Sequence, residues 1–193
     1  MKSVCVFCGG NPGARPSYKA MATTLGTALA RRSIGLVYGG ASVGLMGAVA
    51  DATLAGGGKV IGVIPRMLAD REIAHTGVTE LVVTGSMHER KATMAAAAEG
   101  FIALPGGFGT MDELFEILTW AQLGLHAKPC GLLDVDGYYR SLLVFLDHAA
   151  DEGLLKREHR DMLLVDDDAG RLLDQMQHYV GPVVEALIRP SQT

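Results

Sequence analysis

The hydrophobic positions of this chain fall into short continuous runs that alternate with longer stretches of helical periodicity. Runs such as Phe101–Leu104 are apolar at consecutive positions rather than at every second one. Continuous apolar strands are expected where helices cover both faces of a parallel sheet. Segments such as Pro16–Arg32 place apolar residues three and four apart, as an amphipathic helix does. The pattern therefore predicts an α/β fold, a doubly wound parallel sheet with helices on both faces, in a single domain over residues 1–193.

Strands and helices are expected to alternate along the whole sequence, with a loop of little regular structure over 69–79 and a polar segment before the last helix. The predicted strands are Ser3–Cys8, Gly35–Tyr38, Val60–Ile64, Glu80–Thr84, Phe101–Leu104 and Cys130–Asp134. The predicted helices are Pro16–Arg32, Leu45–Ala55, Met87–Ala98, Thr110–Leu123, Tyr138–Glu152 and Ala169–Tyr179.

Composition narrows the classes of partner. The net charge of −4 argues against broad electrostatic binding to nucleic acid or to an anionic membrane, although one local phosphate site remains compatible with it. The apolar run at the N-terminus is too short for the core of a signal peptide, and no stretch approaches the length of a membrane span. We therefore expect a cytoplasmic protein with neither a nucleic-acid nor a membrane partner.

Two of the three cysteines form a C-x-x-C pair, Cys5 and Cys8, which is a pattern typical of redox and metal sites. Here the pair lies in an apolar run that reads as a strand, where residues three apart point to opposite faces. Reactive pairs need a setting that stabilises the thiolate, such as a helix N-terminus. Burial in the core is therefore favoured over redox or zinc chemistry, and no convincing set of metal ligands is present elsewhere.

Three glycine-rich loops each follow a predicted strand and precede a predicted helix: 9–13, 39–44 and 105–110. In a parallel sheet all three lie at the carboxyl ends of strands, the edge where open α/β sheets bind ligands. Free amides at helix N-termini favour anions there. The three loops together predict a ligand that carries a phosphate. The usual G-x-G-x-x-G and G-x-x-x-x-G-K-[ST] signatures are absent, which disfavours a nicotinamide dehydrogenase or an ATPase.

The segment 105–113 admits two interpretations of its carboxylates. Thr110 and Glu113 have the spacing of a capping box, in which the glutamate binds back to the start of the helix, and spacing alone favours this structural role. Asp112 has a similar structural interpretation as an anion on the helix dipole. A carboxylate beside a phosphate loop can also bind ribose hydroxyls, activate water or stabilise an oxocarbenium ion.

The run Pro105-Gly106-Gly107-Phe108-Gly109-Thr110-Met111-Asp112-Glu113 resembles the P-G-G-x-G-T-x-x-E signature of the LOG ("Lonely guy") family. An Arg-Lys pair near the start of the preceding helix, Arg90 and Lys91, is similar to that family too, as are the runs 120–124 and 136–139. LOG proteins are cytokinin riboside 5′-monophosphate phosphoribohydrolases that are often labelled lysine decarboxylases. The resemblance covers nearly the whole chain.

The resemblance implies a Rossmann-like fold, a homodimer and hydrolysis of AMP or an N6-modified AMP to free base and ribose 5-phosphate, with no cofactor and no metal. It implies that Arg90 and Glu113 are catalytic. The residues that it implies as substrate or phosphate contacts are Glu72, Lys91, Gly106, Gly107, Phe108, Gly109, Thr110, Met111, Asp112 and Thr119. Without it, Arg90 and Lys91 are equally explained as a solvated helix face.

One position departs from the family pattern: relatives often carry a serine where this chain has Gly10, so that Asn11 or Ser17 are the candidates to replace the lost hydroxyl. Two other function classes stay open. A pyridoxal-phosphate-dependent lysine decarboxylase needs a Schiff-base lysine, for which Lys91 is the nearest candidate. A non-catalytic nucleotide or cofactor carrier of the same fold needs the phosphate loop but not an Arg90–Glu113 pair.

Overall fold

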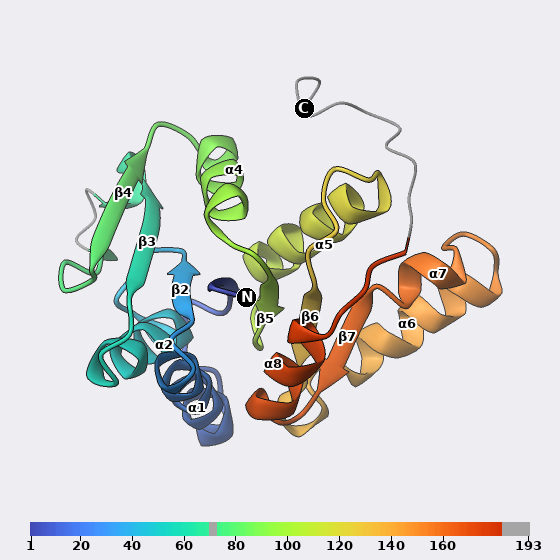
Figure 1. The fold of residues 1–193 in the computed structure, drawn as a ribbon, viewed down its shortest axis with the longest axis horizontal. Helices are drawn as coiled ribbons and strands as arrows, with labels where there is room; N and C mark the ends of the chain where they lie inside the picture. Colours follow the sequence, from blue (N-terminus) through green and yellow to red (C-terminus); the bar gives the residue numbers. More distant parts are fainter. Residues whose placement is uncertain (70–72, 183–193) are drawn as a thin grey trace.

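The computed structural model describes residues 1–69 and 73–182 and confirms the predicted α/β fold. Its strands form one parallel sheet in the order β4-β3-β2-β1-β5-β6-β7 (Figure 1). The strands are β1 (Ser3–Phe7), β2 (Gly35–Tyr38), β3 (Val60–Pro65), β4 (Glu80–Thr84), β5 (Phe101–Ala103), β6 (Cys130–Leu133) and β7 (Leu163–Asp166).

The order of strands in the sheet changes direction between β1 and β5. The chain builds the sheet outward from β1 to β4, then returns to the other side of β1 and continues from β5 to β7. The two central strands pair in parallel, with Phe7 opposite Ala103 at their carboxyl ends. The loops that leave these two ends diverge to opposite halves of the sheet, which opens a crevice between them. The topology therefore places the loops after β1 and β5 on either side of the expected ligand position.

Helices cover both faces of the sheet, as predicted. One apolar core joins α1, α2 and α8 to the sheet, and a second core joins α4, α5 and α6 to the other face (Figure 1). The helices are α1 (Pro16–Arg31), α2 (Gly44–Ala55), α3 (Arg66–Leu68), α4 (Met87–Ala97), α5 (Phe108–Gln122), α6 (Arg140–Asp151), α7 (Arg157–Arg160) and α8 (Ala169–Gln177), with a 3-10 turn η2 (Val135–Gly137).

The central strand β1 shows why its apolar residues run without interruption. Val4 and Val6 point into the core under α1 and α2, whereas Cys5 and Phe7 point into the core under α4 and α5. All four side chains are almost completely buried. Because both faces of the strand are covered, no position on it needs a polar side chain.

The predicted elements are present, with ends shifted by at most two residues. Among the described residues the structure adds four short elements: α3 after β3, η2 after β6, and two more near the last helix. The polar segment before the last helix contains α7 and the edge strand β7, and neither was predicted. The predicted loop 69–79 holds one isolated bridge, between Ala41 and Ala74, within its described part. The largest local differences are that α5 begins at Phe108 rather than at Thr110 and α6 at Arg140 rather than at Tyr138.

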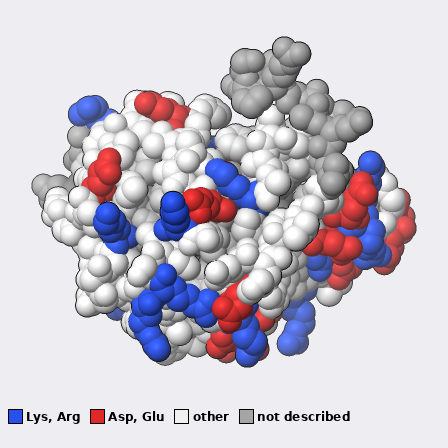
Figure 2. All heavy atoms as spheres, viewed as in Figure 1, with Lys and Arg blue, Asp and Glu red and all other residues white. Residues whose placement is uncertain are grey.

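Charged side chains of both signs are interspersed over the face shown in Figure 2, without a broad field of one sign. Recognition of a charged ligand therefore depends on local groups in a cavity rather than on a surface-wide potential. Within residues 1–69 and 73–182, none of the helices has the length and apolar character needed to cross a bilayer.

Candidate active site

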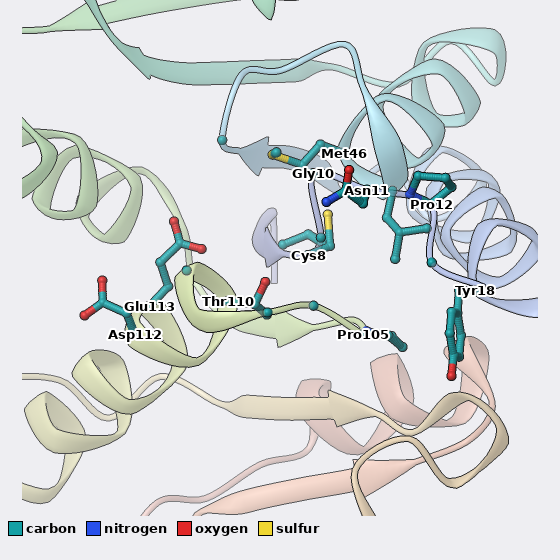
Figure 3. A pocket seen from close by; sticks show the side chains of 18 of the residues that line it. Cys8, Gly10, Asn11, Pro12, Tyr18, Met46, Pro105, Thr110, Asp112 and Glu113 are labelled. Carbon is teal, nitrogen blue, oxygen red and sulfur yellow. The ribbon is translucent and has the colours of Figure 1, made fainter. Parts of the chain in front are cut away.

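A cavity of about 460 Å³ opens at the carboxyl ends of β1, β2 and β5. In Figure 3, Cys8 lies in its middle, between Met46 and Thr110, with Glu113 and Tyr18 toward opposite ends. All three predicted glycine loops contribute to the lining, so the sequence located this edge of the sheet correctly. The lining residues are Val6, Cys8, Gly9, Gly10, Asn11, Pro12, Gly13, Tyr18, Gly39, Leu45, Met46, Met87, Arg90, Pro105, Gly106, Gly107, Gly109, Thr110, Asp112, Glu113 and Tyr138.

A buried ion pair forms part of this lining. Nη1 of Arg90, on α4, donates to Oε1 of Glu113, on α5, at 2.7 Å. Each residue keeps only 8% of its surface exposed. Charged groups that are so deeply buried are rarely found without a partner. The structure thus joins the two residues that the resemblance singles out.

Arg90 is fixed from several directions. Its helix α4 is capped at its start, because Ser86 Oγ accepts from the Glu89 amide while Glu89 Oε2 accepts from the amide of Gly85, just before the cap. Nε of Arg90 also donates to the carbonyl of Val63 in β3 at 3.1 Å. The guanidinium is therefore held by a strand on one side and by the Glu113 carboxylate on the other.

Gly39 makes room for this guanidinium. A Cβ at position 39 would overlap with Nη2 of Arg90 and would lie 2.9 Å from the sulfur of Met46. Only glycine leaves enough space at the end of β2 for Arg90 to reach Glu113. The glycine loop after β2 thus serves the buried pair, a role different from the phosphate cradle that the sequence predicts.

Burial raises the pKa of Glu113 above its ordinary value, while the Arg90 guanidinium acts in the opposite direction. The two influences are those expected of a carboxylate that is removed from water but has a cationic hydrogen-bond donor beside it. A buried carboxylate whose pKa is shifted by burial and by a specific charged partner is a candidate for a catalytic group.

The interpretation of Thr110 and Glu113 as a capping box is wrong. The helix begins at Phe108, its N-cap is Gly107, and no side chain caps it. Glu113 instead turns its carboxylate to Arg90 across the cavity. The first intrahelical bond joins the Met111 amide to the Gly107 carbonyl, so the amides before Met111 have no partner within the helix. Such an uncapped N-terminus is a ready site for an anion.

Lys91 lies beside the catalytic candidates but does not line the cavity. Its Nζ forms ion pairs with Asp112 and Glu116 of α5, each at 3.1 Å. Burial alone would lower the pKa of Lys91, but the hydrogen bonds to Glu116 and Asp112 raise it. Within this chain Lys91 therefore joins α4 to α5 through carboxylates. A role in substrate contact remains a prediction for Lys91.

Three further predicted contacts lie apart from this cavity. Phe108 and Met111 line an adjoining apolar cavity of about 350 Å³, together with Tyr139 and Leu142. Thr119 lies about three turns beyond the start of α5, where its hydroxyl donates to the carbonyl of Phe115 at 2.7 Å. Their roles stay predictions, and Glu72 lies outside the described residues.

The glycine at position 10 is not required by lack of space, because a Cβ there would lie 3.4 Å from the terminal methyl of Met46. Of the two candidates to replace a hydroxyl, Asn11 lines the cavity. Ser17 does not line it and donates to Asp136 at 2.5 Å instead. The structure therefore keeps Asn11 as the candidate.

Several lining residues were not singled out from the sequence. Tyr18 and Tyr138 approach the cavity from α1 and from the turn after β6, and Met46 approaches from α2. Met87 is 41% exposed and also lines the cavity. Of these residues, only Tyr138 could have been predicted to lie in the site, because it belongs to the run 136–139 that is similar to the LOG family.

The cysteines are core residues, as the sequence predicts. Cys5, Cys8 and Cys130 are all free and buried, and Cys5 and Cys8 belong to cores on opposite faces of the sheet. Burial raises the pKa of each thiol, that of Cys130 to about 12. Among the described residues, no cluster of three or more His, Cys, Asp or Glu side chains could hold a metal ion.

Fold and site together define a Rossmann-like α/β protein with an uncapped helix N-terminus and a buried Arg–Glu pair at its topological switch point. A family model described as "Possible lysine decarboxylase" matches residues 46–176. The chain is 52% identical over 178 residues to cytokinin riboside 5′-monophosphate phosphoribohydrolase LOG7 of Arabidopsis thaliana, covering 92% of this chain and 82% of that one. It is 50% identical to LOG1 of the same plant, with coverages of 93% and 84%. The chain belongs to this LOG family.

Solved structures share the fold at lower identity. The molybdenum cofactor binding protein from Rippkaea orientalis superposes with a TM-score of 0.70 at 20% identity, covering 92% of this chain and 96% of that one. The molybdenum cofactor carrier protein from Chlamydomonas reinhardtii gives a TM-score of 0.68 at 24% identity, with coverages of 92% and 97%. These likenesses establish the architecture only.

Proposed function

We propose that this protein hydrolyses the N-glycosidic bond of AMP or an N6-modified AMP to give the free base and ribose 5-phosphate. In this reaction the C1′–N9 bond breaks, the hydroxyl of a water adds to C1′, and a proton goes to the base. The observation that carries the proposal is the buried Arg90–Glu113 pair in one cavity with the uncapped start of α5. The family membership supports the same reaction.

The 5′-phosphate is proposed to bind at the start of α5. Gly106, Gly107, Gly109 and Thr110 line the cavity there, and the amides of this first turn have no partners within the helix. A phosphate held at this end supplies binding energy that is remote from the bond to be broken. That energy can orient the ribose relative to the pair on the cavity wall.

Glu113 is proposed to stabilise the positive charge that develops on the ribose as the base leaves. A carboxylate can do so by holding ribose hydroxyls, by orienting the attacking water or by direct attack on C1′. Arg90 has five donors and does not deprotonate, so it serves as a charge partner rather than as a general acid. Its bonds to Val63 and Glu113 keep it oriented toward the reacting atoms.

The two competing functions are less well supported. A carrier needs no Arg–Glu pair, yet Arg90 and Glu113 face the same cavity and contact each other. A Schiff-base lysine must be a free amine with a lowered pKa. The pKa of Lys91 is raised, and its ammonium is held by two carboxylates. Hydrolysis without pyridoxal phosphate is therefore the function that the site favours.

We also propose that the chain acts as a homodimer. Apolar side chains on α5 and α6 are exposed, among them Phe108 at 96% and Phe145 at 61%. Exposed apolar side chains of this kind are commonly buried in homodimer interfaces. Light scattering after gel filtration tests the proposal, since a dimer has twice the mass of the 20.4 kDa chain. A monomer at micromolar concentration would contradict it.

The test of the reaction is incubation of purified protein with AMP and with N6-isopentenyl AMP, followed by chromatography. We expect free base and ribose 5-phosphate in equal amounts, and the ratio of the two rates measures the substrate preference. Adenosine is the matched control, since it has the same bond but no phosphate to bind at α5. Absence of base release from both nucleotides, in a protein that binds AMP, would instead favour a nucleotide carrier.

A further inference from the structure

Three consecutive carbonyls in the loop between β5 and α5 each accept a hydrogen bond from a residue outside the loop. The Leu104 carbonyl accepts from the Tyr139 hydroxyl at 2.6 Å. The Pro105 carbonyl accepts from the Gly9 amide at 3.0 Å. The Gly106 carbonyl accepts from the Tyr138 hydroxyl at 2.6 Å. The carbonyl oxygens of this loop are therefore bound to donors of the protein. Held in this way, they are not free to turn toward a bound anion and repel it.

The two tyrosines come from the turn after β6, in the run 136–139 that the reaction as described above does not use. Asp136 and Gly137 both have positive φ, of 53° and 71°, which turns the chain sharply before Tyr138. The carboxylate of Asp134 accepts from the Tyr139 amide at 2.7 Å and fixes the turn from within. This turn therefore aims two neighbouring phenol groups at one loop.

The two phenols differ in their surroundings. Tyr139 is only 1% exposed and belongs to the apolar core, so its hydroxyl satisfies a buried carbonyl in a structural role. Tyr138 is 41% exposed and lines the cavity that holds Arg90 and Glu113. Its ring is held edge-on by Tyr18, with ring centres 5.6 Å apart. Of the pair, only Tyr138 combines access to the cavity with a bond to the loop.

The hydrogen bond from Tyr138 fixes the peptide unit between Gly106 and Gly107. A planar trans peptide directs its N–H opposite to its C=O, so fixing the carbonyl also fixes the Gly107 amide. Two adjacent glycines have much backbone freedom, and a loop of this kind needs an outside contact to keep one conformation. Gly107 is the N-cap of α5, so the same contact sets where the helix begins.

We propose that Tyr138 is a positioning residue for the phosphate site, holding the Gly106–Gly107 backbone in the conformation that binds the 5′-phosphate. This inference rests on the proposed function for the identity of the ligand. Tyr138 acts through the loop and takes no part in cleavage. Its loss therefore weakens binding of the phosphate group and leaves contacts to the nucleoside unchanged.

The test compares binding in a background that does not turn over the ligand. The parent is Glu113→Gln, and the double variant adds Tyr138→Phe, which removes one hydroxyl. By calorimetry we expect the Kd of AMP to rise about tenfold in the double variant, with the Kd of adenosine unchanged. Tyr179→Phe, which removes a phenol hydroxyl next to a separate cavity, is the matched control and should leave both values unchanged.

Equal AMP affinities in parent and double variant, or an equal loss of AMP and adenosine binding, would overturn the proposal. If Tyr138→Phe does not fold, the wild-type protein still provides a test by NMR. Addition of inorganic phosphate should shift the amide resonance of Gly107, and an equal ionic strength of chloride should not. An unmoved Gly107 resonance overturns the proposal. These readouts do not depend on cleavage, so they remain separate from the assay of the proposed reaction.

Discussion

Arg90 and Glu113 meet at 2.7 Å although they stand 23 positions apart and belong to different helices. Each helix begins at the carboxyl edge of the sheet, which brings Arg90 in the first turn of α4 to Glu113 in the second turn of α5. The pair is buried and lies on the wall of the cavity formed by the glycine loops. A charged group in such a place influences both the chemistry of a ligand and the stability of the fold.

Glu113→Gln should abolish turnover while leaving AMP binding roughly intact. Glutamine retains an oxygen that can accept from Arg90, but it carries no charge to stabilise the ribose cation. We expect base release to fall below detection, a loss in kcat of more than about a thousandfold, with the Kd of AMP changed little. A variant that keeps most of its activity would show that the role of Glu113 is structural.

The rate should depend on the protonation of Glu113. Because burial raises its pKa above the ordinary value of a glutamate, the reactive carboxylate is lost on acidification earlier than for an exposed glutamate. We expect kcat/KM to rise with pH through an apparent pKa above about 4.3, the value in model peptides, and then to level off. Full activity maintained at and below that pH would contradict the assignment.

Gly39→Ala should impair catalysis without preventing folding. The added methyl would occupy the space of the Arg90 guanidinium and displace it from Glu113. We expect kcat/KM for AMP to fall at least tenfold, which corresponds to about 1.4 kcal/mol in the transition state.

Gly35→Ala is the matched control for that variant, since Gly35 begins the same strand. A Cβ at position 35 would meet its nearest neighbour, the Lys2 carbonyl oxygen, at 3.6 Å, which is an ordinary contact. This variant should keep the wild-type rate. A similar loss of activity in both variants would mean that β2 is disturbed as a whole, rather than Arg90 in particular.

The three thiols should be inert in the native protein. Cys5, Cys8 and Cys130 are buried, and burial raises their pKa, so little reactive thiolate is present at neutral pH. Ellman's reagent should detect none of them in native protein and all of them in denaturant. Fast reaction of native Cys8, which borders the cavity, would point to a mobile cavity floor.

The edge of the sheet that carries the site could be predicted because it depends on local patterns. Continuous apolar runs identified the central strands, and the glycines after them marked the three loops that line the cavity. The strand β7 was missed because it is four residues long, lies at the edge of the sheet and runs into three aspartates. Its pairing with β6 is a tertiary contact, which no local pattern records.

The geometry of the site depends on tertiary contacts more strongly than the order of the strands does. Spacing alone assigned Glu113 to a capping box, but a capping box is a local arrangement and the structure has a stronger distant partner in Arg90. The start of α5 likewise depends on the loop that Tyr138, Tyr139 and Gly9 hold from outside. The resemblance pointed to Arg90 and Glu113, whereas the pattern of residues favoured a structural role for Glu113 and left the role of Arg90 undecided.

The burial of Arg90 with Glu113 also bears on how such a site is inherited. Replacing one partner of a buried ion pair by an apolar residue leaves an uncompensated charge and costs about 3–5 kcal/mol. That cost is a large share of the roughly 5–15 kcal/mol by which a domain is stable. Selection for folding alone therefore opposes the loss of either residue, so a copy of the gene freed from its original task would tend to keep both.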